Sequence, residues 1–229
     1  MKLKLSLLVS TLLMAANVSA VTVNWTDWTS AHLRTNPNSA QGTMLFGANP
    51  VAVTYTGQIE FAITGPDTNY WTEPNPAARP YTGGEVGNAP PASDLIAMNT
   101  ASNRTLTFSE AVSDLYFAYI SMNGNSFTFN RDFEFISQGH GYWGNGLATK
   151  VNNDNGTFTL NAVDGEPHGI IKLMGSFNSL AWTNSTDENW YGFTVGTADL
   201  PASGIPEPAT YALVGAALLS AAALRRRRA

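Results

Sequence analysis

Short runs in which apolar and polar residues alternate recur through the middle of the chain. Residues Val51–Thr56 and Ile59–Thr64 alternate in this way on either side of Gly57 and Gln58. A period of two is typical of a β-strand with one buried face. Leu115–Ile120 is almost continuously apolar, which predicts a central strand buried on both faces. The same reasoning predicts further strands at residues 104–108, 126–129, 133–136, 157–163, 170–174, 179–183 and 190–195.

Gly, Asn, Asp and Pro residues separate these runs and predict the turns between strands. Asn155-Gly156 is a strong turn signal just before the run at 157–163. Asn130–Asp132 separates two phenylalanine-rich runs, and this pattern predicts a β-hairpin. One short helix is predicted at Ala92–Met98, after two prolines. Four phenylalanines are expected to share one face of the hairpin: Phe127, Phe129, Phe133 and Phe135.

About ten short strands and almost no helix predict an all-β fold. We expect a two-sheet antiparallel β-sandwich, jelly-roll-like, over residues 21–197. One segment interrupts the rhythm, because Gly65–Pro91 is 27 residues rich in Pro, Gly and Asn. An ordered loop of that length is unusual. We expect it to pack across one face or edge of the sandwich.

The first twenty residues have the pattern of a secretion signal. Lys2 and Lys4 precede an apolar run over residues 5–16, and the segment ends at Ala20. A basic start, a short apolar stretch and a small final residue are typical of a secretory signal peptide. We therefore expect the secretion machinery to recognise residues 1–20 and cleavage to follow Ala20.

The C-terminus has a different three-part pattern. Pro206, Glu207 and Pro208 precede an apolar stretch over residues 211–224 and then four arginines. As a helix the stretch would span about 21 Å, which is shorter than the ~30 Å hydrocarbon layer of a membrane. Basic residues favour the cytoplasmic side, so we expect a transient inner-membrane intermediate with the body outside. The four arginines are Arg225, Arg226, Arg227 and Arg228.

Pro-Glu-Pro, a short apolar helix and an arginine cluster, in this order, resemble the PEP-CTERM sorting signal over residues 205–229. The resemblance implies recognition by an exosortase, a membrane-bound cysteine protease, and cleavage near Pro-Glu-Pro. It also implies a Gram-negative host that makes exopolysaccharide. The protein is then expected at the cell surface or in the extracellular matrix. Residues 198–204 are expected to be a linker between the body and this signal.

The body is similar to a recurring group of PEP-CTERM proteins without an assigned activity. The similarity rests on three segments, Ser113–Gly124, Gly139–Gly146 and Glu188–Gly196. It implies no catalytic residues.

Setting both ends aside changes the charge of the chain. The whole sequence has 12 Lys and Arg against 17 Asp and Glu. Six basic residues and one acidic residue belong to the two targeting segments, which leaves 6 basic and 16 acidic residues. Such an acidic body repels phosphate backbones, so nucleic acid is not an expected partner. The sequence has no cysteine, which excludes thiol catalysis and cysteine metal sites.

No catalytic motif is recognisable in the chain. His32, His140 and His168 have no metal-site spacing. His140 and His168 converging with Glu166 is one possibility, but turns explain both histidines better. Glycoside hydrolysis needs two facing carboxylates, and so many acids make some pairing inevitable. We therefore expect a protein that is not an enzyme. The candidate carboxylates are Asp132, Glu134, Asp164, Glu166, Asp187 and Glu188.

Two kinds of ligand remain open. Oxygen-rich Asn152–Gly156 and, more weakly, Asp187-Glu188 are candidates for Ca²⁺, although a hairpin turn explains the first segment better. Aromatic rings suit the apolar faces of sugars. Trp71 and Tyr81 in the long loop and Trp143 between glycines are the candidate ligand-binding residues. Trp182 and Trp190 are expected to pack in the core.

These patterns favour an exported surface or matrix protein that acts in adhesion or in association with exopolysaccharide. A carbohydrate-binding, lectin-like module is the first alternative, and a polysaccharide-active enzyme is the second. Ice binding is disfavoured because the sequence has no regular Thr-x-Thr array.

Overall fold

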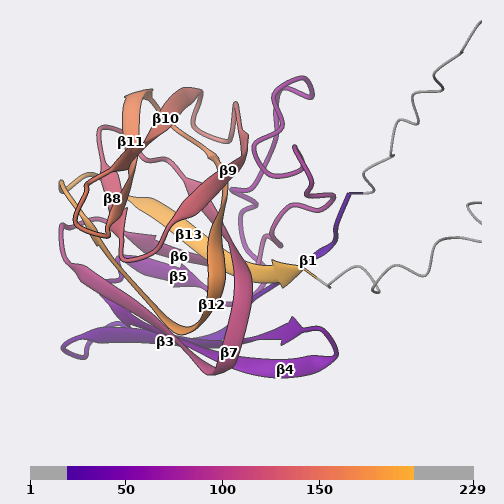
Figure 1. Ribbon diagram of the computed structural model, residues 1–229, viewed down its shortest axis with the longest axis vertical. Coiled ribbons are helices and arrows are strands. Elements are labelled where there is room, and N and C mark those ends of the chain that lie inside the picture. The colour runs from indigo at the N-terminus through magenta and orange to yellow at the C-terminus, as the bar shows by residue number, and fades with distance from the viewer. Residues whose placement is uncertain (1–19, 199–229) are drawn as a thin grey trace, which may run out of the picture.

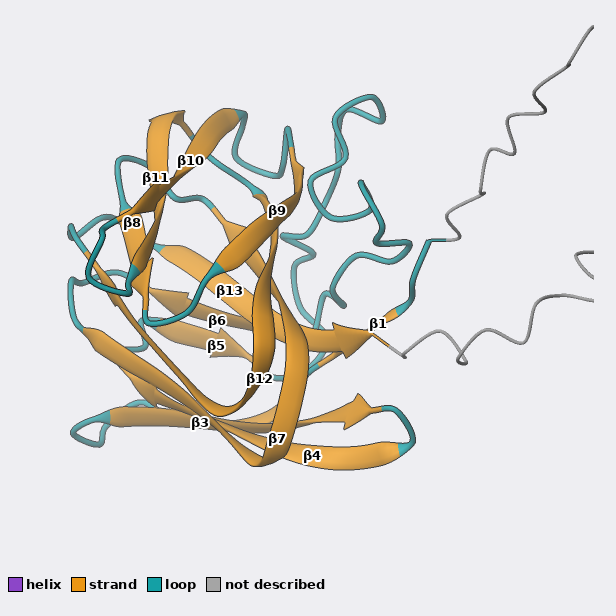
Figure 2. Ribbon diagram, in the orientation of Figure 1, coloured by secondary structure: helices purple, strands orange, loops and turns teal. Residues whose placement is uncertain are grey.

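The computed structural model describes residues 20–198, which form strands and loops but no helix (Figure 2). The prediction of an all-β fold is therefore confirmed. The strands are β1 (Val23–Trp25), β2 (Asp27–His32), β3 (Asn38–Phe46), β4 (Asn49–Gly57), β5 (Phe61–Ile63), β6 (Leu95–Met98), β7 (Asn103–Ile120), β8 (Ser126–Phe129), β9 (Phe133–Gln138), β10 (Gly146–Asn152), β11 (Phe158–Gly165), β12 (Gly169–Asn184) and β13 (Tyr191–Ala198).

Every pair of neighbouring strands is antiparallel, and all thirteen strands belong to one sheet. Its main path runs β10-β11-β8-β12-β7-β13-β6-β5, while β4, β3 and β2 continue from another part of β7. In Figure 1, β3 and β4 lie at the bottom and β13, β6 and β5 lie above them. The prediction of an antiparallel sheet is thus confirmed, and its division into a two-sheet jelly roll stays a prediction.

The two longest strands, β7 and β12, turn the sheet through a corner. The sequence predicts two separate strands within each of them, and this prediction is wrong. The pairing of β7 with β12 shifts register between Leu173 and Ser176, where Gly175 has a φ of 87° and Asp114 a φ of 53°. The amide of Gly175 donates to Asp114 Oδ1 at 3.1 Å. Register shifts of this kind bend strands without ending them.

The bend gives each half of β7 its own neighbours. The half before the bend pairs with β4, and the half after it pairs with β13. The core lies between these parts of the curled sheet. The rings of Phe117 and Phe193 stack there with their centroids 5.1 Å apart, and Trp182 packs edge-on against both.

The predicted hairpin of β8 and β9 is wrong in its pairing. Both strands pair with β12, β8 at residues 182–184 and β9 at residues 169–173. The chain therefore continues along β12 through Asn130–Asp132 instead of reversing. Alternation alone does not distinguish these two paths, because both keep the same faces buried. Three of the four expected phenylalanines are fully buried, and Phe135 packs against the same core.

Two shorter predictions had opposite outcomes. The expected helix at Ala92–Met98 is wrong, because Leu95–Met98 forms strand β6 with all four residues buried. Ile96 and Met98 face the main core, while Leu95 faces a second apolar cluster, which explains the continuous apolar run.

The turn at Asn155-Gly156 is confirmed between β10 and β11, and Gly156 has a φ of 80°. Glycine adopts such a backbone at little cost.

The long loop between β5 and β6 covers the outer face of the sheet, as expected. Its residues Trp71, Tyr81 and Val86 are buried in the second apolar cluster. The sheet contributes Tyr116 and Ile170 to this cluster. The indole N–H of Trp71 donates to the carbonyl of Asp94 at 3.2 Å, so the polar atom of the buried ring is paired.

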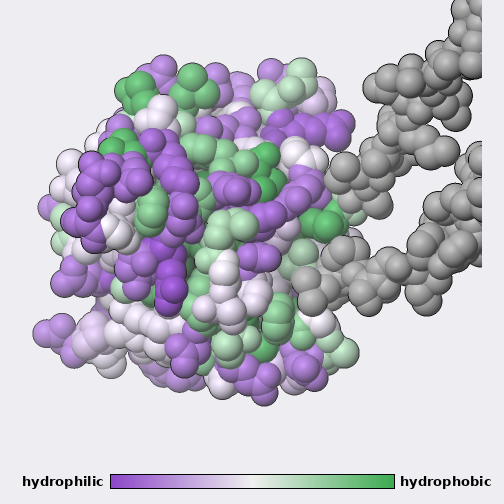
Figure 3. Space-filling view, in the orientation of Figure 1, coloured by the Kyte–Doolittle hydropathy of each residue, from purple (hydrophilic) through white to green (hydrophobic). Residues whose placement is uncertain are grey.

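The first and last described strands lie side by side, since Val23 pairs with Ala198. The face drawn in Figure 3 mixes hydrophilic residues with smaller hydrophobic spots. Among residues 20–198 there is no helix with the length and apolarity to cross a membrane. Residues 1–19 of the expected signal peptide (1–20), residues 199–204 of the expected linker (198–204) and the expected helix at 211–224 lie outside the described residues.

Candidate functional site

Four loops meet at one edge of the sheet because the strand registers bring their ends together. Ile120, the last residue of β7, pairs with Gly192 near the start of β13. Tyr119 pairs with Gly169 at the start of β12. Gly169 also pairs with Gln138 at the end of β9. The loops after β7 and β9 and those before β12 and β13 therefore lie close together.

These loops enclose an open pocket with a volume of about 520 Å³. Two tryptophans, two carboxylates, two amides and one hydroxyl line it: Trp143, Trp190, Glu166, Glu188, Asn123, Asn189 and Ser121. The three segments Ser113–Gly124, Gly139–Gly146 and Glu188–Gly196 each contribute at least one of these residues. Segments far apart in the chain thus form a single site.

Glu166 is held in place by the loop that follows β7. The hydroxyl of Ser121 donates to Glu166 Oε2 at 2.7 Å, and the amide of Glu166 donates to the carbonyl of Asn145 at 3.1 Å. Ser121 has a φ of 57°, a backbone conformation that few residues other than glycine adopt. The strained turn aims the hydroxyl at the carboxylate.

Glu188 has a different environment. Its amide donates to the carbonyl of Asn99 at 2.9 Å, but both of its carboxylate oxygens are buried without a hydrogen-bond partner. Burial, and then the charge of Glu166, raise the pKa of Glu188 to about 8. At neutral pH the pocket therefore contains one carboxylic acid that is mostly protonated.

A cluster of aromatic rings continues outward from the pocket. The ring of Tyr70 lies 5.1 Å from Trp190 and 5.0 Å from Tyr142, measured between centroids. It also stacks on Trp143 at 6.4 Å. Tyr142 and Trp143 are 41% and 51% exposed, so they present apolar ring surface to solvent beside the polar pocket. Trp190, expected in the core, is half-buried and lines the pocket.

His168, in the loop directly before β12, is fully buried. Its Nδ1 is 3.0 Å from the hydroxyl of Tyr81. Burial, and then the nearby His140, lower the pKa of His168 to about 4, which keeps the imidazole neutral. Gly141 packs directly on the imidazole ring, since a Cβ at that position would overlap it. His168 is thus a buried packing residue that does not line the pocket.

Comparison with known families identifies the C-terminal segment. Residues 204–228 match the model of the PEP-CTERM protein-sorting motif. The chain carries a PEP-CTERM sorting motif. This motif supports an exported protein that is sorted by an exosortase, as the sequence predicts. A search of curated proteins and a search of solved structures each found no match.

The residues expected to act in sorting are not part of the described structure. Pro206, Glu207 and Pro208 and the arginines 225–228 lie within the matched motif. Ala20 is the first described residue and is exposed. Cleavage after Ala20 stays a prediction.

The candidate ligand-binding aromatics divide into two groups. Trp71 and Tyr81, two of the candidate ligand-binding residues, are only 2% and 0% exposed under the long loop, so the structure does not present them to a ligand. The loop has its own apolar residues, and they bury against the outer face of the sheet instead of facing solvent. Trp143 is exposed beside the pocket, as expected.

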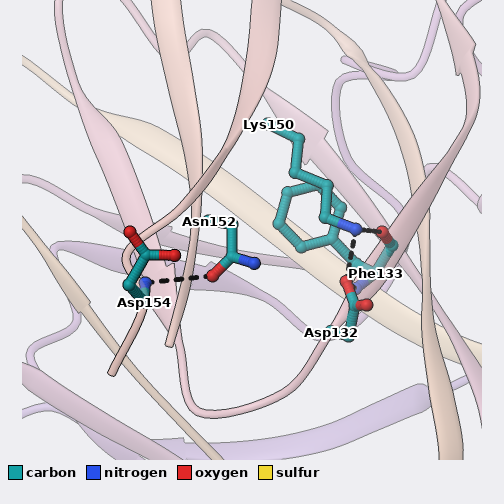
Figure 4. A network of polar contacts seen from close by, with 5 residues as sticks. All are labelled: Asp132, Phe133, Lys150, Asn152 and Asp154. Carbon is teal, nitrogen blue, oxygen red and sulfur yellow. Dashed lines mark hydrogen bonds and ion pairs between the residues drawn. The ribbon is translucent and has the colours of Figure 1, made fainter. Parts of the chain in front are cut away.

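Of the six candidate carboxylates, Glu166 and Glu188 line the pocket. Asp132 forms an ion pair with Lys150, whose ammonium also donates to the carbonyl of Phe133 at 2.7 Å (Figure 4). Asp164 accepts the amide of Leu147 at 2.8 Å, and Asp187 accepts the amide of Ala101 at 2.6 Å. These two carboxylates thus hold the backbone of loops and strands. Glu134 lies in β9 and is exposed.

The oxygen-rich segment at 152–156 forms the turn between β10 and β11. Asn152 Oδ1 accepts the amide of Asp154 at 3.0 Å (Figure 4), and Asn155 Oδ1 accepts the amide of Thr157 at 3.0 Å. These bonds use the side-chain oxygens to build the turn. Among residues 20–198 no three His, Asp or Glu residues are grouped to hold a metal ion. Calcium binding stays a prediction.

Proposed function

We propose that the protein, once exported and sorted by an exosortase, associates with exopolysaccharide through the pocket at the edge of its sheet. The single observation that carries this proposal is the exposed aromatic cluster beside a polar pocket. Flat apolar rings suit the C–H face of a sugar, and side-chain amides and carboxylates suit its hydroxyls. The sorting motif supports delivery to the cell surface, and the resemblance to PEP-CTERM proteins implies a host that makes exopolysaccharide.

The environment of Glu188 favours binding over catalysis. A catalytic acid must reach the atom to which it transfers a proton. Both carboxylate oxygens of Glu188 are closed off from solvent. The most exposed side chains of the pocket are the indole of Trp143 and the amides of Asn123 and Asn189, while Glu166 is half-buried in its lining. Such groups bind and orient a sugar without reacting with it.

The binding test uses exopolysaccharide extracted from the producing cells and the protein recovered from their surface. Trp143→Ala removes an exposed ring at the pocket, and Leu33→Ala is a matched control because Leu33 is 45% exposed in the turn after β2. We expect Trp143→Ala to weaken binding about tenfold, since an aromatic contact contributes about 1 kcal/mol beyond its buried area. Equal binding by wild type and both variants would show that the polysaccharide does not bind at the pocket.

Sorting is tested separately by intact mass. We expect the protein from the cell surface to have lost its signal peptide and the sorting motif at 204–228 when the host exosortase is present. Deleting the exosortase is expected to leave the motif attached. An intact C-terminus in both strains would contradict sorting by cleavage.

A second candidate function is hydrolysis of the same polysaccharide. It is favoured by Glu166 and Glu188 lining one pocket, because glycoside hydrolysis uses a pair of carboxyl groups. The release of reducing ends from the polysaccharide measures this activity. Glu110, an exposed carboxylate in β7, provides the control variant Glu110→Gln. If wild type and Glu110→Gln release reducing ends and Glu188→Gln does not, hydrolysis replaces binding as the function of the pocket.

A further inference from the structure

The pocket is lined by two acidic side chains, Glu166 and Glu188, and by no basic one. Within residues 20–198 the ion pairs join Lys150 to Asp132 and Lys172 to Glu85, away from the pocket. Glu166 and Glu188 thus have no cationic partner in the described part of the chain. Arg104, which contacts Tyr191 next to Glu188, is engaged by Asn184 and by backbone carbonyls.

Glu188 is the unusual member of this pair. Its carboxylate oxygens accept no hydrogen bond, although they are buried. A carboxylate in this position costs free energy to ionise, unless a cation comes close enough to stabilise its charge. The proximity of Glu166 adds to this cost. A positive charge on a bound ligand would therefore lower the free energy of ionising the Glu188 carboxylate.

The other side chains of the pocket favour an organic cation with hydroxyl groups over a bare metal ion. Trp143 and Trp190 present indole rings with centroids 6.2 Å apart at one side. Indole faces attract cations as well as the C–H faces of sugars. Asn123 and Asn189 supply both donors and acceptors, which match hydroxyl groups. A bare metal ion would use the carboxylates but would gain little from the indole rings.

We infer that the pocket selects sugar residues with a free, protonated amino group, so that its polysaccharide ligand is a de-N-acetylated hexosamine polymer. This inference rests on the proposed function, since it names the class of glycan for the same site. Glu166 and the indole rings contact the ammonium group, and its positive charge also stabilises the ionised form of the buried Glu188 carboxylate. The two asparagines take the ring hydroxyls.

The ligand test is isothermal titration calorimetry at about pH 6, where the amino groups are protonated. The probes are four oligosaccharides of equal length: a glucosamine oligomer, its N-acetylated counterpart, a neutral glucose oligomer and a galacturonic acid oligomer. We expect the glucosamine oligomer to bind at least about tenfold more tightly than the other three, as charge-assisted contacts are about twice as strong as neutral ones. Each titration is repeated with EDTA and with added Ca²⁺.

The variant test compares Glu166→Gln with Glu110→Gln. Both remove one carboxylate, but Glu110 is exposed in β7, ten residues before the end of that strand, and does not line the pocket. We expect Glu166→Gln to weaken binding of the glucosamine oligomer about tenfold and to leave the N-acetylated oligomer unchanged. Glu110→Gln is expected to behave as wild type. Thermal melting of each variant verifies its fold, and the wild-type comparison of oligomers stands even where a variant unfolds.

The outcomes separate this inference from the proposed function. Equal or tighter binding of the neutral, N-acetylated or acidic oligomers would overturn the preference for an amino sugar and leave glycan binding intact. Binding that disappears with EDTA and returns with Ca²⁺ would also overturn it, because a metal ion would then supply the positive charge. If neither the four oligomers nor the extracted polysaccharide bind, both the inference and the proposed function fail.

Discussion

Replacing Glu188 with glutamine is the sharpest test of the pocket's electrostatics. The glutamine has nearly the same shape as the protonated acid but cannot ionise. In the folded protein the pKa of Glu188 is about 8, whereas an unperturbed glutamate has a pKa of 4.5. Between these two values the unfolded chain loses the proton and the folded chain keeps it. Wild type should therefore lose stability as the pH rises from about 4.5 to about 8, and the loss should level off above that.

The size of the effect follows from the gap between the two pKa values. For a fully buried carboxyl group the gap corresponds to a ceiling of about 5 kcal/mol. The Glu188 residue is only half-buried, so water screens part of the penalty and we reduce the figure to about 2 kcal/mol. Glu188→Gln is expected to stabilise the fold by that amount at about pH 8. It should have almost no effect below about pH 4.5, where the carboxyl is protonated in both states.

Urea denaturation at about pH 4 and pH 8, monitored by circular dichroism, measures both quantities. Glu110→Gln serves as the control, since it also removes one carboxylate but lies exposed in β7, outside the pocket lining. The reasoning is refuted if Glu188→Gln shifts stability equally at both pH values. It is also refuted if the variant is less stable than wild type at pH 8, because the carboxylate would then have a stabilising partner.

Three further predictions concern packing, and urea midpoints measure each of them. Trp71→Ala should cost about 3–5 kcal/mol because the ring is buried under the long loop, whereas Trp143→Ala should cost less than about 1 kcal/mol. Gly141→Ala should cost about 1–3 kcal/mol because its methyl group overlaps the ring of His168. Gly65→Ala, with open space around the added methyl group, is its neutral control. Equal costs for the two tryptophans, or for the two glycines, would contradict the packing described above.

The periodicity of the sequence predicts most of the strands but not how they join. Residues 104–108 and 115–120 read as two strands, yet both belong to β7. The residues between them contain Asp114, whose left-handed backbone bends the strand instead of ending it. That conformation depends on the amide of Gly175, which is distant in sequence. A local pattern therefore predicts an interruption and cannot distinguish a corner from a turn.

The candidate site was predictable only in part, for a similar reason. Trp143 was predictable because glycines surround it in a loop. Trp71 has equally polar surroundings, but its burial depends on which face of the sheet the long loop covers. Glu166 and Glu188 were two among many acidic residues in the sequence. Only the pairing registers of the neighbouring strands bring these two to the same pocket. Tyr70, Tyr142 and Asn189 were missed because their roles depend on contacts between loops.

The pocket and the segment that leads to the sorting motif lie at opposite ends of β13. Glu188 and Trp190 directly precede Tyr191, the first residue of β13, and Ala198 at the other end leads toward the sorting motif. Eight residues of strand separate these ends, or about 25 Å at ~3.3 Å per residue. The pocket therefore lies at the far end of the strand from the point at which the chain leaves toward its C-terminus. Attachment of the body through its C-terminal end is therefore expected to leave the pocket accessible to a polysaccharide.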